Sequence, residues 1–118
     1  MNTNQFKQKL ISDYNEINMQ LFDVGTKEVR VNIIDNKILI MAVHRRVKAI
    51  RSIDKKNRLF TRQMDVLLID EFKKKLCDKI KTKYGFQVVS ILKDYDPLTE
   101  WSATVIVLES NVETHLIG

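Results

Sequence analysis

The sequence has one cysteine, one proline, three glycines and no long apolar run. A single cysteine, Cys77, cannot form an internal disulfide, so the composition suits a reducing compartment. A membrane-spanning helix needs about 20 apolar residues in succession, and the segment from Met1 to Phe22 lacks the continuous apolar core of a signal peptide. We therefore expect a cytoplasmic protein, with peripheral attachment to a membrane as an alternative.

The rare residue types also limit the chemistry. The glycines are isolated from one another, so no glycine-rich loop can cradle a phosphate. The two histidines, His44 and His115, lie far from Cys77 and from each other, without the short spacings of a zinc site. We predict no cofactor, no metal site and no catalytic residue set. The chain is therefore expected not to be an enzyme, and no small-molecule substrate is evident.

Three carboxylates, Asp94, Asp96 and Glu100, lie close together around Pro97. Such a cluster can bind a cation or act as an acid and base pair. Aspartate and proline are also ordinary turn residues, and a turn explains the cluster better.

A chain of 118 residues, 44% hydrophobic and 30% charged, fits a single folded domain spanning residues 1–118. Its last segment, residues 110–118, has no periodic pattern. We predict that this segment is a mobile tail.

Two segments have the apolar periodicity of amphipathic helices, one from Arg58 to Tyr84 and one from about Thr3 to Asp23. The stripe of the long helix consists of Phe60, Met64, Leu67, Leu68, Ile69, Phe72, Leu76, Ile80 and Tyr84, and that of the first helix of Phe6, Leu10, Tyr14, Ile17 and Leu21. Asn2 and Asn4 both remain candidates for the first N-cap. Gly25 and Gly85 are predicted to end the two helices.

From Lys27 the apolar period changes to two, which predicts a strand followed by a turn at Asp35–Asn36 and a return strand to Val43. With this turn, Ile33 pairs with Ile38, Val31 with Ile40 and Val29 with Ala42, which gives one apolar face for the core.

A short helix is predicted from Arg45 to Ile53, with a break before the long helix and Asn57 as its N-cap. Residues 86–93 and 101–108 are rich in strand formers and predict a second hairpin. The predicted fold is therefore α+β and two-layered, in the order αββααββ, with a four-stranded sheet and helices on one face.

The net charge of +5 is concentrated in one segment. Residues 44–62 hold eight basic residues against Asp54 alone, a net charge of +7, so the rest of the chain sums to −2. The candidate anion-binding or partner-binding residues of this basic segment are Arg45, Arg46, Lys48, Arg51, Lys55, Arg58 and Arg62. They could meet phosphate or anionic lipid, but a merely solvated surface explains them slightly better.

The second strand is apolar on both faces. Leu39, Met41 and Val43 lie opposite the core-facing side chains, and one layer of helices covers only one face of a sheet. We predict that these three residues form a homodimer interface. The alternative is that the segment from Arg45 to Ile53 folds back over them.

The hairpin and its flanks resemble the MpsC-like family of small bacterial proteins. The resemblance rests on Val24-Gly25-Thr26-Lys27-Glu28-Val29-Arg30-Val31, the second strand to Val43, the long helix ending at Tyr84-Gly85 and the paired strands after it. It covers the chain up to Glu109. It implies a non-enzymatic accessory protein associated with a membrane system for cation translocation or inorganic-carbon uptake, with a transporter subunit as partner. A nucleic-acid-binding module that uses residues 44–62 is the alternative hypothesis.

Overall fold

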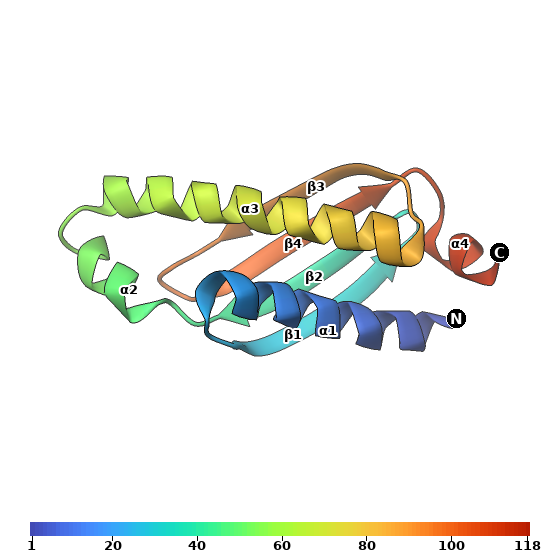
Figure 1. Cartoon of the computed structure of the whole chain (residues 1–118), viewed down its shortest axis with the longest axis horizontal. Coiled ribbons are helices and arrows are strands. Elements are labelled where there is room, and N and C mark those ends of the chain that lie inside the picture. Colours follow the sequence, from blue (N-terminus) through green and yellow to red (C-terminus); the bar gives the residue numbers. More distant parts are fainter.

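The computed structural model describes all 118 residues as four helices and four strands. In chain order these are α1 (Thr3–Phe22), β1 (Thr26–Ile34), β2 (Lys37–His44), α2 (Lys48–Asp54), α3 (Arg58–Tyr84), β3 (Val88–Tyr95), β4 (Trp101–Leu108) and α4 (Val112–Ile117). The strands form one antiparallel sheet in the order β1-β2-β4-β3 (Figure 1). The predicted α+β class with a four-stranded sheet is confirmed.

The first hairpin has the predicted register. Ile33 pairs with Ile38, Val31 with Ile40 and Val29 with Ala42. In the turn, Asp35 takes a left-handed conformation with a φ of 55°, which aspartate tolerates better than most residues. The two edge strands, β1 and β3, are both irregular, with register shifts between Thr26 and Glu28 and between Val88 and Ser90.

The core lies between the sheet and the helices α1 and α3, which run side by side in Figure 1. Its fully buried side chains come from both layers and include Phe6, Leu10, Tyr14, Ile17, Ile38, Ile40, Phe72, Leu76, Ile80, Ile106 and Leu108. Both predicted helix stripes contribute, because residues spaced by three and four positions share one side of a helix. The sheet face that carries Ile38, Ile40 and Ala42 is therefore the one that α1 and α3 contact.

The helix ends follow the capping chemistry of the sequence in three of four cases. Asn2, rather than Asn4, caps α1, and Asn57 caps α3, so the predicted break between α2 and α3 is confirmed. Gly85 ends α3 with a φ of 72°. The prediction for Gly25 was wrong, because Asp23 takes the left-handed position at the end of α1.

The predicted core stripe of α3 was wrong in its first half. Phe60 is 48% exposed and Leu67 is 70% exposed, whereas Thr61 and Asp65 are buried. Helix α3 is longer than the sheet, and its first turns project beyond the strands beside α2 (Figure 1). In these first turns the buried residues, Thr61 and Asp65, lie on the side of α3 toward α2, whereas Phe60 and Leu67 of the predicted apolar stripe are exposed.

Three segments differ from their predicted structure. The short helix predicted from Arg45 to Ile53 begins at Lys48 and ends at Asp54, because Val47 is in an extended conformation before it. The third strand begins at Val88 rather than at residue 86 and continues to Tyr95. The C-terminal segment, predicted as a mobile tail, forms α4, in which Val112 is buried and the ring of His115 stacks on Phe86 at 4.0 Å between centroids. None of the four helices is both long and apolar enough to cross a lipid bilayer.

Replacing each of the two phenylalanines of α3 by alanine should lower the free energy of unfolding by different amounts, because one lies in the core and the other on the projecting end of the helix. Phe72→Ala is expected to lower the free energy of unfolding by about 3 to 5 kcal/mol, because Phe72 is fully buried. Phe60→Ala, the matched control, should cost less than about 1 kcal/mol. Urea unfolding followed by circular dichroism measures both, and equal losses would contradict the exposure of Phe60.

Candidate functional site

Polar side chains meet inside the molecule where α1, β2, β3 and β4 come together. We call this set the buried polar cluster; its members are Tyr14 and Asn18 of α1, His44 of β2, Lys93 of β3, and Ser102 and Thr104 of β4. All except Lys93 are buried. The Lys93 side chain points toward the core because it alternates with Leu92 and Asp94, which lie on the other face.

The hydrogen bonds of the cluster run in one direction. Asn18 donates its amide to the carbonyl of Val24, so its Oδ1 is the free acceptor, and His44 Nδ1 donates to it at 2.6 Å. His44 Nε2 must then accept from the Tyr14 hydroxyl at 2.5 Å. Lys93 Nζ in turn donates to the Tyr14 oxygen at 2.7 Å. The imidazole is therefore held neutral, with its proton on Nδ1.

The environment shifts the pKa of each titratable group in the cluster. Burial, reinforced by the charge of Lys93, lowers the pKa of His44 to about 3. Burial lowers the pKa of Lys93 to about 7. Burial raises the pKa of Tyr14 well above its ordinary value, so its phenol stays protonated. Lys93 is thus the group of this cluster that changes its charge near neutral pH.

A cavity of about 40 Å³ adjoins the cluster between α2, α3 and the ends of β2 and β3. Its apolar walls are Phe22, Val47, Ile50, Leu68, Ile69 and Phe72, and Lys93, Ser102, Tyr95 and Arg46 are among its polar ones. Since one water needs about 10 to 15 Å³ measured in this way, the cavity has room for about three waters. The titratable side chains of His44, Asp65 and Lys93 are among those that line it.

Arg46 forms the other side of the cavity and is only 7% exposed. Its guanidinium donates to Asp54 at 2.7 Å and to Asp65 at 2.6 Å, and Arg58 pairs with Asp65 at 3.1 Å. Burial alone would lower the pKa of Arg46, but the bonds to the two carboxylates raise it, and they hold the pKa of Asp54 below its usual range. This ion-pair network joins α2 to α3.

Glu100 ties the start of β4 to the same region. Its carboxylate accepts from the backbone N–H of Arg46 at 2.6 Å and pairs with Lys27 and Arg51 at 2.6 and 3.0 Å. These hydrogen bonds lower the pKa of Glu100, the one from Lys27 most. In the same loop, Asp96 accepts from the Leu98 N–H, which is turn chemistry. No group of three or more His, Cys, Asp or Glu side chains in the molecule is arranged to hold a metal ion.

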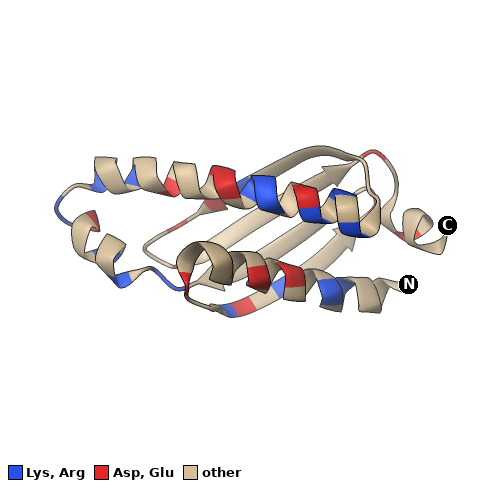
Figure 2. Cartoon of the chain, in the orientation of Figure 1, with Lys and Arg blue, Asp and Glu red and all other residues tan.

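The structure divides the basic segment into paired and unpaired residues. Arg46, Arg51, Arg58 and Arg62 all have acidic partners, with Arg62 placed 3.7 Å from Asp94. Arg45, Lys48 and Lys55 are exposed and form no ion pair. Figure 2 shows basic positions in α2, in the loop after it and at the start of α3, with acidic positions among them. The surface of this segment is therefore less positive than its sequence alone suggests, because nearby carboxylates neutralise four of its arginines.

The sheet face turned away from the core carries a second group of apolar residues. We call it the outer face; its apolar members are Ile34 of β1, Leu39, Met41 and Val43 of β2, Leu92 of β3, and Trp101, Ala103, Val105 and Val107 of β4. Trp101 is 42% exposed and Leu92 is 58% exposed. The basic segment does not fold over this face, because Ile50 of α2 lines the cavity with Leu68 and Ile69 of α3.

The sequence predicted which residues of β2 lie on the outer face, but it did not predict the buried polar cluster. Tyr14 was read only as a core residue and Lys93 only as part of a strand. A usable signal was present, because Ile91, Lys93 and Tyr95 alternate along β3, and a lysine at the middle, core-facing position is unusual. The bulge at Val89 obscured that alternation.

Comparison with known proteins found no relative of this chain. No protein-family model matches the chain, and neither a curated protein nor a solved structure was found to be similar. The functional argument therefore rests on the molecule's own geometry.

The neutral state of His44 should make stability depend on pH. Its pKa is 6.5 in the unfolded chain and about 3 in the folded one, so between these values the unfolded state binds more protons. Stability is therefore lost as pH falls below 6.5, by up to about 1.4 kcal/mol per pH unit from this group. Urea unfolding from pH 7 to about pH 5 should show a shallower slope for His44→Gln. Parallel slopes for the two proteins would contradict a buried neutral imidazole.

Proposed function

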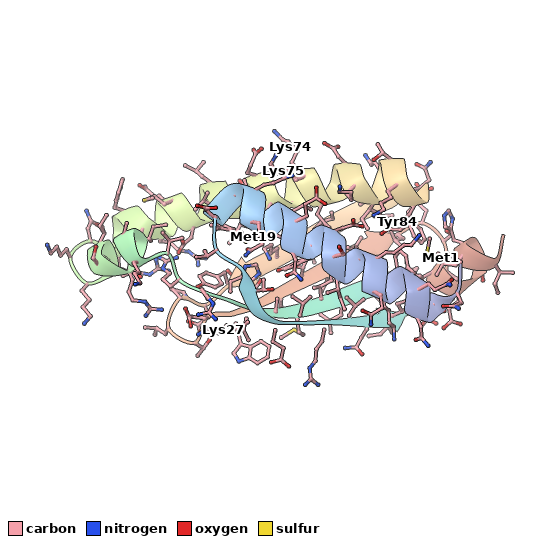
Figure 3. All side chains as sticks on the ribbon, turned by 60° about the horizontal axis from the view of Figure 1, so that its bottom comes forward. Met1, Met19, Lys27, Lys74, Lys75 and Tyr84 are labelled. Carbon is pink, nitrogen blue, oxygen red and sulfur yellow. The ribbon has the colours of Figure 1, made fainter.

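We propose that this protein is a non-enzymatic interaction protein that forms a homodimer through the outer face of its sheet. One observation carries the proposal: the apolar residues of β2, β3 and β4 occupy the side of the sheet opposite α1 and α3. In the view of Figure 3 the helices lie above the sheet and side chains project freely below it, on the side where Lys27 is labelled. In the two-layer arrangement that we propose, the predicted order αββααββ gains α4 at its end and α1 and α3 occupy one face, which leaves this surface for a partner.

The outer face has about the size that a dimer requires. Strands of eight residues rising about 3.3 Å each, four strands about 4.8 Å apart, give a projected area of roughly 500 Å². A standard interface buries roughly 800 Å² of accessible surface per partner, which includes the relief of the side chains. The area is therefore of the right order for two copies.

The residue pattern favours a two-fold axis parallel to the strands, between β2 and β4. Arg30, Met41, Ala103 and Asp94 form one row across the four strands. A rotation about this axis places Met41 over Ala103 and Arg30 over Asp94 of the second copy. A large side chain then meets a small one, and opposite charges meet at both edges.

A hollow in the outer face suits this arrangement. Its volume is about 200 Å³, and its lining includes Met41, Trp101, Ala103 and Asp94. The side chain of Arg30 is 75% exposed at the opposite edge of the sheet and is long enough to enter such a hollow. Each copy thus offers both the Arg30 side chain and the hollow that would receive Arg30 of the other copy.

The cellular role that we propose follows the resemblance to the MpsC-like family. The homodimer would act as an accessory component of a membrane system for cation translocation or inorganic-carbon uptake, with a transporter subunit as its partner. The exposed Arg45, Lys48 and Lys55 offer a surface for anionic lipid at such a membrane.

The nucleic-acid hypothesis receives less support from the structure. Four of its seven candidate residues already neutralise carboxylates, and one of these, Arg46, is buried. Phosphate binding depends on the number of free cations that a surface presents. We therefore do not retain it as a second function.

Sedimentation equilibrium tests the dimer. The wild-type chain should be a dimer at micromolar concentration, and Leu39→Glu or Met41→Glu should raise the dissociation constant at least about 100-fold, because each copy would bury an unpaired charge. Leu67→Glu is the matched control, since Leu67 is exposed on α3 and should leave the dimer intact.

Charge reversal in the same assay checks the orientation. Arg30→Asp alone should weaken the dimer, and adding Asp94→Arg should restore it if these residues meet across the interface. A monomeric wild-type chain would refute the dimer, and a double variant weaker than both single variants would refute this two-fold arrangement.

Affinity capture from cells of the source organism, after solubilisation of the membrane, tests the accessory role. The wild-type chain is expected to recover a subunit of a cation or inorganic-carbon transport system, identified by mass spectrometry. A variant with Arg45, Lys48 and Lys55 replaced by glutamine should recover less of it if the exposed basic residues assist membrane attachment. Repeated recovery of no transport subunit would remove the accessory role while leaving the dimer untouched.

A further inference from the structure

Lys93 carries a charge that the surrounding protein does not balance. It forms no ion pair, and its Nζ is surrounded by the hydroxyls of Tyr14, Ser102 and Thr104 and by the ring of Phe72, whose centroid is 4.3 Å away. The ion-pair network nearby is neutral in itself, because Arg46 and Arg58 match Asp54 and Asp65. Although Lys93 as a whole is only partly buried, its amine is largely withdrawn from water, and a desolvated cation without a counter-charge is costly.

The hydrogen bonds around Lys93 use all of its donors. When charged, Lys93 donates its three protons to Tyr14, Ser102 and Thr104. Tyr14 passes its own proton on to His44, and the hydroxyls of Ser102 and Thr104 also hydrogen-bond to the Tyr14 oxygen, which lowers its pKa against the larger effect of burial. All of these partners of Lys93 are neutral hydroxyls, so none of them balances its charge. A ligand that brings negative charge would supply the missing counter-charge.

The adjoining cavity sets the size and the character of such a ligand. Lys93 and Ser102 both line it, and so do the apolar side chains of Ile50, Leu68 and Ile69. Its volume of about 40 Å³ matches a molecule of three or four non-hydrogen atoms. The cavity thus combines polar and charged groups, including Lys93, Ser102 and Arg46 with its partner Asp65, with a mostly apolar lining.

We propose that this cavity binds a small monocarboxylate anion of the size of acetate, with its carboxylate paired to Lys93 and accepting a hydrogen bond from Ser102. The methyl group of the ligand would contact the apolar wall. This site does not involve the outer face, so it stands or falls independently of the dimer.

Binding should weaken as pH rises, because only the charged amine attracts the anion. The pKa of Lys93 without ligand is about 7, so the affinity should be constant below pH 7 and fall by up to about tenfold per pH unit above it. The other titratable groups that face the amine or line the cavity are Tyr14, His44, Arg46, Asp65 and Tyr95. The pKa of His44 is far below this range and that of Tyr95 is raised to about 12, so neither changes its charge there.

Titration of the full-length protein with sodium acetate, followed by ¹H–¹⁵N correlation spectra at constant ionic strength, tests the proposal. Saturable shifts of residues around the cavity are expected at millimolar acetate and about pH 6, with weaker binding at about pH 9. Sodium chloride should not reproduce the shifts. Pivalate, whose tert-butyl group exceeds the cavity, should not bind.

Variants decide whether Lys93 holds the anion. Lys93→Met should abolish binding, and Lys74→Met, the control on the exposed side of α3 labelled in Figure 3, should leave it unchanged. If Lys93→Met does not fold, Ser102→Ala should weaken binding at least about tenfold, and Ile69→Phe should block it by filling the cavity. Identical responses to chloride and acetate, or acetate binding unchanged in these variants, would overturn the proposal.

Discussion

The structure depends on the constraint that a β-sheet presents two faces and α1 with α3 pack on one of them. The period-two pattern of β2 sends Ile38, Ile40 and Ala42 toward the helices and Leu39, Met41 and Val43 to the other side. The first set is fully buried and packs with side chains of both helices in the hydrophobic core. The second set is only partly buried, so the alternate positions of one strand contribute unequally to folding.

A second constraint acts at the projecting end of α3, where no strand lies beneath the helix. There the contacts change from apolar packing to charge pairing, with the guanidinium of Arg46 between Asp54 and Asp65. Removal of one partner would leave a buried charge without compensation, which costs more than the pair contributes when complete. The segment that is most basic in sequence is therefore largely a structural element, and it forms one wall of the cavity.

Much of this architecture could be predicted from sequence, because it depends on local periodicity and capping. The bounds of α3, the register of the first hairpin and Asn57 as a cap all follow from side chains that act within a few residues. The exposure of Phe60 could not be predicted, because it depends on where the sheet ends relative to the helix. The buried polar cluster joins Tyr14, His44 and Lys93 from three separate elements, and no local pattern brings them together.

The irregular edge strands also restrict what can pair with the sheet. A regular free edge offers a row of unpaired N–H and C=O groups on which a foreign strand can extend the sheet. In β1 the register shifts beside Lys27, and in β3 it shifts beside Val89. An incoming strand would lose its hydrogen-bond register at either bulge, so continuous growth into fibrils is disfavoured at both edges. Both edges of the sheet are thereby protected against the addition of a foreign strand.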